Sequence, residues 1–102
     1  MKDFNEDSLF AEQSVIGGLL KLCSPESKLM IRTMSMLKPT SFYKLYHKQI
    51  FSAIQALFVK NENIDLLVVE EQCKRQGLDD PDLFIYLAVT MRETPSAENI
   101  IA

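Results

Sequence analysis

The sequence predicts an all-α fold, a compact bundle of about six short helices. Three observations lead to this expectation. Apolar residues recur three and four positions apart, the spacing that places them on one face of a helix. The most strand-like run, residues 64–69, leads directly into a strongly helical segment. The chain has 102 residues, 47% of them apolar and 25% charged, a composition that suits one hydrophobic core and no second module.

The first helix is expected over residues 9–23, after an N-terminal tail at residues 1–7. Its apolar stripe consists of Ala11, Val15, Ile16, Leu19, Leu20 and Leu22. Gly17 and Gly18 lie within this helix, where each glycine costs about 1 kcal/mol relative to alanine. We therefore expect another helix to approach closely there, at a place where a side chain would not fit.

The second helix is expected to begin at Ser24 and Pro25, with Ser24 as its N-cap and Pro25 at its first position. It runs to about Leu37, and the residues on its apolar face are Met30, Met34 and Leu37. Residues 38–41, with a proline at their second position, end it. The third helix, from about Lys44 to Lys60, has the broadest apolar stripe: Tyr46, Ile50, Ala53, Ile54, Leu57 and Phe58.

Three capping signals divide the rest of the chain. Asp65 is expected to cap a fourth helix over residues 66–76, with Gly77 in the left-handed conformation after it. Asp80 and Pro81 are expected to open a fifth helix that ends near Arg92, with Leu83, Phe84, Leu87, Ala88 and Met91 as its apolar residues. A sixth helix of only about two turns would follow Thr94 and Pro95. Because a helix of about two turns is marginal alone, we expect the chain to be a piece of a longer protein.

The charge is unevenly distributed along the chain. Residues 1–20, 21–60 and 61–102 carry formal charges of −3, +6 and −6, which give the net −3. An acidic total argues against a dedicated nucleic-acid binder. The uneven distribution has two interpretations: the segments neutralise one another on solvated faces, or they provide electrostatic complementarity between copies or with a partner.

Composition also limits the chemistry and the location. Cys23 and Cys73 form no CxxC motif and His47 is the only histidine, so we expect no structural zinc site. Both cysteines are expected to be small buried residues in a reducing cytoplasm. Residues 1–8 are acidic and polar, unlike a signal peptide, and no apolar run approaches the length of a membrane span.

We find no catalytic constellation in the sequence. No GxxxxGK[ST] loop is present, and the Gly17-Gly18 pair lies inside a helix, where backbone N–H groups are already bonded. His47 is either a general base or, as we favour, a structural histidine bonded to a neighbouring loop or helix end. The sequence therefore predicts no catalytic, cofactor-binding or metal-binding residue.

Three sequence blocks are more specific. The first is SLFAEQSVIGGLL at residues 8–20; the second contains Phe42, Tyr43, His47, Ile50 and Phe51, followed by Ile64, Asp65 and Leu66; the third contains Tyr86, Leu87 and Ala88, followed by TPSAENI at residues 94–100. In this order and spacing they resemble the N-terminal domain of the DnaB-type replicative DNA helicases, over residues 8–102. One departure is Asp82-Leu83, where the family usually has two glycines.

The resemblance implies a role in DNA replication as the helical head of a hexamer collar, at residues 8–102. Such heads pair with one another and support contacts with primase and the helicase loader in the cytoplasm. The ATPase motor, with its ATP and magnesium, is absent from this chain, which is therefore expected not to be an enzyme by itself. Direct contact with nucleic acid or with a membrane is not expected.

We expect the fifth helix and the loop before it to contribute to self-pairing, with Asp65, Asp82, Leu83 and Phe84 as interface residues. Structural roles are expected for Gly17, Gly18, His47 and Phe51. One alternative is a standalone phage or prophage regulator that mimics the collar and binds replisome proteins. Another is a small enzyme with a titrating His47 in a polar pocket.

Overall fold

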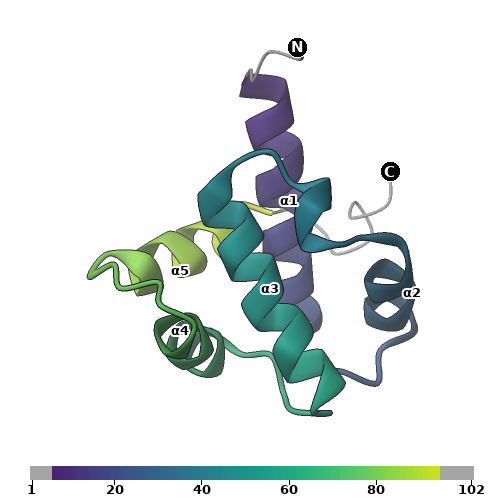
Figure 1. Cartoon of the computed structure of the whole chain (residues 1–102). Helices are drawn as coiled ribbons and strands as arrows, with labels where there is room; N and C mark the ends of the chain where they lie inside the picture. The colour runs from purple at the N-terminus through teal and green to yellow at the C-terminus, as the bar shows by residue number, and fades with distance from the viewer. Residues whose placement is uncertain (1–5, 95–102) are drawn as a thin grey trace.

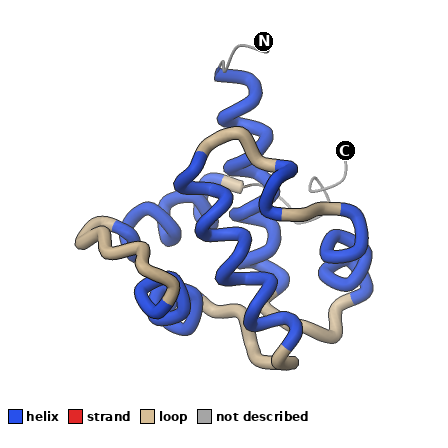
Figure 2. Tube along the Cα trace, viewed as in Figure 1, coloured by secondary structure: helices blue, strands red, loops and turns tan. Residues whose placement is uncertain are grey.

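The computed structural model describes residues 6–94, with side chains from residue 9 onward. This part of the chain is helical and contains no strand (Figure 2). In chain order the elements are α1 (Glu6–Leu22), α2 (Lys28–Met36), the 3-10 helix η1 (Pro39–Ser41), α3 (Leu45–Val59), α4 (Leu66–Arg75) and α5 (Leu83–Glu93). The predicted all-α fold is confirmed. The sixth helix expected after Thr94 lies outside the described residues.

The helices pack around α3, which lies at the centre of the molecule (Figure 1). α1 packs against α3 and α5, α4 packs against α3 and α5, and α2 lies on the opposite side of α3 from α4. The largest fully buried side chains include Ile16, Leu19, Ile50, Phe51, Ile54, Leu57, Leu83 and Leu87. These residues come from α1, α3 and α5. Met30 of α2, Val69 of α4 and Ile64 before α4 are also fully buried, so every α-helix contributes to one core. Each helix in the described ranges is too short or too polar to cross a membrane.

Two helix ends follow the predicted capping chemistry. The Asp65 carboxylate accepts a hydrogen bond from the backbone N–H of Val68 at 2.9 Å and caps α4. Gly77, after α4, has a φ of +95°, in the left-handed region where glycine is favoured. Local chemistry was sufficient to place both ends of α4.

Two other helix starts were predicted too early. Ser24 does not cap α2: its hydroxyl accepts the N–H of Glu26, and Ser27 caps the helix three residues later. Asp80 likewise accepts the N–H of Asp82 at 2.9 Å, and α5 begins only at Leu83. In both places the polar side chain and the following proline form a turn before the helix.

Three further expectations need correction. α1 begins at Glu6, three residues before the expected start of the first helix at residue 9. Ala11 is exposed and is not part of the buried stripe of α1. Cys73 is buried, but Cys23 is exposed and has a φ of +44° at the end of α1. The carbonyl of Cys23 accepts the N–H of Ile64 at 2.9 Å, which ties the end of α1 to the segment before α4.

Candidate functional site

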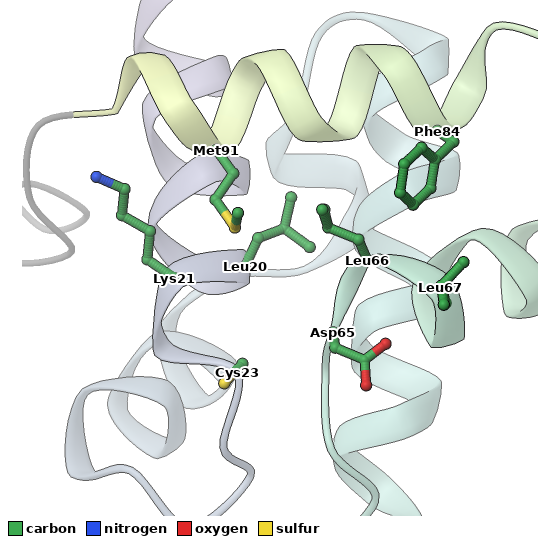
Figure 3. Close-up of a pocket in the computed structure, with 8 residues that line it drawn as sticks. All are labelled: Leu20, Lys21, Cys23, Asp65, Leu66, Leu67, Phe84 and Met91. Atoms are coloured by element: carbon green, nitrogen blue, oxygen red, sulfur yellow. The ribbon is translucent and has the colours of Figure 1, made fainter.

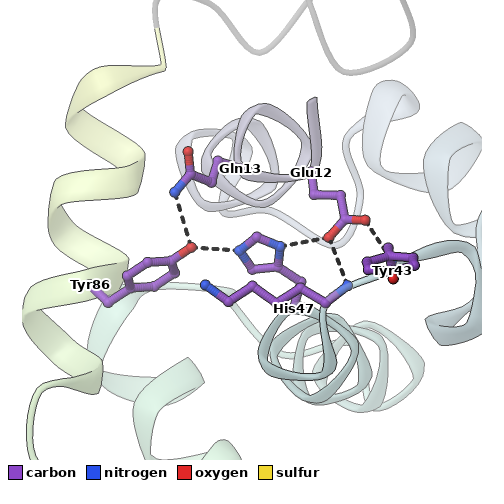
Figure 4. Close-up of polar contacts among 6 residues, drawn as sticks. Glu12, Gln13, Tyr43, His47 and Tyr86 are labelled. Atoms are coloured by element: carbon purple, nitrogen blue, oxygen red, sulfur yellow. Dashed lines mark hydrogen bonds and ion pairs between the residues drawn. The ribbon is translucent and has the colours of Figure 1, made fainter. Parts of the chain in front are cut away.

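The first turn of α3 carries a fully buried histidine between two other helices (Figure 4). The Nδ1 atom of His47 lies 2.8 Å from Oε1 of Glu12 on α1, and its Nε2 lies 2.5 Å from the hydroxyl oxygen of Tyr86 on α5. Gln13, also on α1, donates to the same hydroxyl at 3.2 Å. These four side chains join α1, α3 and α5, and we call them the His47 cluster.

The carboxylate of Glu12 has a second role at the start of α3. It accepts the backbone N–H groups of Tyr43 at 2.5 Å and of Lys44 at 3.3 Å. Lys44 is the N-cap residue of α3 and provides no side-chain cap. Glu12 therefore supplies, from another helix, a carboxylate at the start of α3, where the positive end of the helix dipole favours its charge.

The protonation of the cluster follows from its burial. Burial lowers the pKa of His47 below its ordinary value of 6.5, although the hydrogen bond to Glu12 and the charge of Glu12 oppose this shift. A neutral imidazole has one N–H, which His47 donates to the Glu12 carboxylate, because a carboxylate only accepts. Its other nitrogen accepts the O–H of Tyr86, and burial raises the pKa of that hydroxyl, which keeps its proton.

A carboxylate bonded to a histidine in this way can orient that histidine as a general base, but a general base has to reach its substrate. His47 is 0% exposed, and both of its nitrogens already have partners. Its partners are side chains on two helices, rather than the loop or helix end that the sequence favoured. The arrangement fastens three helices to one another and presents no reactive atom to solvent.

A separate apolar groove opens between the end of α1, the start of α4 and one face of α5 (Figure 3). Its volume is about 640 Å³. The apolar side chains that line it are Leu20, Leu66, Leu67, Phe84 and Met91, and the polar ones are Lys21, Cys23 and Asp65. Leu67 is 66% exposed. An open apolar surface of this kind is typical of places where another molecule docks.

The four predicted interface residues do not form one patch. Asp65 and Phe84 line the groove, and Phe84 is half-buried. Leu83 is 0% exposed, so it belongs to the core and offers no surface to a partner. Asp82 is exposed but borders a different hollow, which it shares with Lys44, Tyr46, Asp80 and Tyr86. The residues expected to have structural roles are all buried: Gly17, Gly18, His47 and Phe51.

The sequence matches the family described as the DnaB-like helicase N terminal domain over residues 5–102. The chain belongs to this family. It is 38% identical over 90 residues to a replicative DNA helicase DnaB from Rhodothermus marinus, a match that covers 87% of this chain and 9% of that protein. It is 34% identical over 96 residues to a replicative DNA helicase DnaB from Pasteurella multocida, where the match covers 93% and 20%. The chain thus spans at most a fifth of the length of either relative.

The fold of this DnaB-like domain is also similar to a solved structure. The crystal structure of the N-terminal domain of DnaB helicase from Mycobacterium tuberculosis matches it with a TM-score of 0.74 and 33% sequence identity. The match covers 90% of this chain and 62% of that one. Sequence and fold therefore agree in assigning the chain to the family of DnaB-like helicase N-terminal domains.

The three sequence blocks that carry the DnaB resemblance meet in the His47 cluster. Glu12 and Gln13 come from the first block, His47 from the second, and Tyr86 from the third. Neither Glu12 nor Tyr86 was predicted from the sequence as a partner of His47. Their place in the blocks that carry the resemblance was the signal available in the sequence.

Proposed function

We propose that this DnaB-like domain is a non-catalytic interaction and oligomerisation head of a replicative DNA helicase. Copies of it pair, contribute to the collar of a hexamer, and support contacts with primase and the helicase loader. ATP hydrolysis, with its magnesium ion, belongs to a motor region that this chain does not contain. The observation that carries the proposal is the match of residues 5–102 to the family of DnaB N-terminal domains.

The geometry supports a binding role better than a catalytic one. The His47 side chain is enclosed within its cluster, whereas the groove presents exposed apolar side chains. Apolar surface that a monomer leaves open is stabilised when another molecule covers it. We therefore assign self-pairing to the groove, with Phe84 and Leu67 as the side chains that a second copy contacts.

Sedimentation of the 102-residue chain across a concentration series tests this assignment. The mass of the chain is 11.7 kDa, and we expect the apparent mass to rise from about 12 kDa toward about 23 kDa as pairs form. Phe84→Glu places a charge in the groove and should hold the chain near the lower mass. Ile85→Glu is the matched control, because Ile85 is the next residue and is 61% exposed but does not line the groove.

Circular dichroism establishes that each variant is folded, and Leu67→Glu provides a second groove variant at a more exposed position. A wild-type chain that remains at about 12 kDa throughout the series would contradict self-pairing. A folded Phe84→Glu chain that pairs like the wild type would contradict the assignment to the groove.

A further inference from the structure

One face of α2 is exposed along its whole length. The exposed residues follow the spacing of a single helical face, which we call the α2 face: Lys28, Ile31, Arg32, Ser35 and Met36. Ile31 is 49% exposed and Met36 is 55% exposed. The opposite side of the helix carries the buried Met30 and Thr33. The α2 face therefore presents apolar side chains to solvent although α2 already has a buried side.

The charge of this face is not balanced by nearby residues in the sequence. Between residues 27 and 61 the chain contains no aspartate or glutamate. Three cationic side chains in this region are exposed: Lys28 and Arg32 on α2, and Lys38 just beyond the helix. Among the side chains of residues 9–94, none of these three cations takes part in an ion pair. The acid nearest in sequence is Glu26, in the turn before α2.

The position of α2 separates this face from the groove. α2 lies on the far side of α3 from α4 (Figure 1), and the groove is lined by residues of α1, α4 and α5 and the segments beside them. The two surfaces share no residue, so a substitution in one leaves the side chains of the other unchanged.

We propose that the α2 face binds an acidic, amphipathic helix of a partner protein. Carboxylates one turn apart on that helix would pair with Lys28 and Arg32, which are themselves one turn apart. The apolar side chains of the partner helix would cover Ile31 and Met36, and this apolar contact would supply affinity. The charged pairs would orient the helix and speed its association. This inference rests on the proposed role of the domain as a protein-binding head and names the chemistry of one partner.

The same observations favour a protein over a nucleic acid. Ile31 and Met36 lie among the cations, and a phosphate backbone offers nothing to cover an aliphatic side chain. A protein helix with both acidic and apolar residues matches both components of the face.

Fluorescence anisotropy tests the proposal with the 102-residue chain and a labelled synthetic peptide of about 18 residues, five helical turns. The peptide carries glutamate at every fourth position beside leucines, and a second peptide has the same composition in scrambled order. We expect the ordered peptide to bind at least about tenfold more tightly than the scrambled one. Arg32→Glu and Ile31→Ser should each weaken its binding about tenfold or more.

The end of α3 supplies matched controls for both changes. Lys60→Glu makes the same kind of charge reversal, and Val59→Ser removes an apolar side chain that is 76% exposed. Both controls should bind the peptide within about twofold of the wild type. Amide NMR shifts on addition of the peptide should concentrate in residues 28–38.

Several results would overturn the proposal. These are no binding of the ordered peptide at about 1 mM, equal binding of the scrambled peptide, or an equal loss with Lys60→Glu. Tighter binding of a labelled single-stranded oligonucleotide would identify the face as a nucleic-acid site instead. Failure of self-pairing in the sedimentation experiment is a separate result, since the groove and the α2 face share no residue.

Discussion

Gly17 of α1 lies directly against Thr94, the residue that follows α5. A Cβ atom on Gly17 would overlap the hydroxyl oxygen of Thr94 and would lie 2.6 Å from the backbone oxygen of Thr90. The Thr94 hydroxyl donates to that same oxygen at 2.9 Å, and the ammonium group of Lys21 bonds the Thr94 carbonyl. The absence of a side chain at Gly17 therefore allows the end of α5 to approach α1 this closely.

We expect Gly17→Ala to destabilise the domain by about 1–2 kcal/mol. Alanine gains about 1 kcal/mol in helix propensity, but overpacking a contact this tight costs about 2–3 kcal/mol, the upper part of the usual range. The backbone oxygen of Thr90 cannot rotate away as a side chain can. Urea unfolding followed by circular dichroism measures the change in the free energy of unfolding.

The double variant Gly17→Ala/Thr94→Ala separates the two obstacles at Gly17. In the Thr94→Ala background, Gly17→Ala should still lower the free energy of unfolding, because the backbone oxygen of Thr90 remains in place. The loss should be smaller than in the wild-type background, because the overlap with the Thr94 hydroxyl has been removed. A Gly17→Ala chain as stable as the wild type would show that α1 and α5 separate easily.

Tyr86→Phe is expected to destabilise the domain by about 1–3 kcal/mol, because it leaves buried polar groups without a partner. The change removes the donor to Nε2 of His47 and the acceptor for Gln13. Tyr46→Phe is the matched control: its hydroxyl bonds Asp80 at 2.7 Å, in a partly exposed place where water can replace it. Chemical denaturation of both variants should show the larger loss for Tyr86→Phe, and equal losses would contradict the role assigned to the His47 cluster.

Local chemistry in the sequence predicted some helix boundaries and misplaced others. Asp65 and Gly77 were placed correctly because each acts on backbone groups within a few residues. Ser24 and Asp80 carry the same kind of signal, but each accepts an N–H two residues ahead and forms a turn. A polar residue before a proline fits either arrangement, and packing of the following helix decides between them.

The His47 cluster depends on contacts that no local pattern contains. Gln13 and Tyr86 are 73 residues apart in sequence, and Glu12 and His47 are 35 apart. Helical periodicity indicates which face of each helix is apolar, but the rotation and offset of α1 against α3 and α5 determine which polar side chains meet. The burial of Leu83 beside the half-buried Phe84 has the same origin, since it depends on how α5 is rotated over the core.

The lowered pKa of His47 predicts that the domain loses stability in mild acid. In the unfolded chain the imidazole titrates near its ordinary value of 6.5, whereas in the folded chain its pKa is lower. Below pH 6.5 the unfolded state therefore binds a proton that the folded state does not, so the free energy of unfolding falls as the pH drops toward the folded-state pKa. The slope from this single group is at most about 1.4 kcal/mol per pH unit.

Two measurements check this prediction. Urea unfolding at several values between pH 7.5 and 5 should show that the free energy of unfolding falls more steeply with decreasing pH for the wild type than for His47→Gln. The difference between the two slopes isolates the contribution of His47, because the other ionisable side chains are common to both chains. His47 is the only histidine in the chain, so its ring proton NMR signals report its titration directly. The midpoint should lie below 6.5 in the folded protein. A midpoint at or above 6.5, with parallel stability curves, would show that the Glu12 carboxylate outweighs burial and that the cluster holds a charged imidazolium.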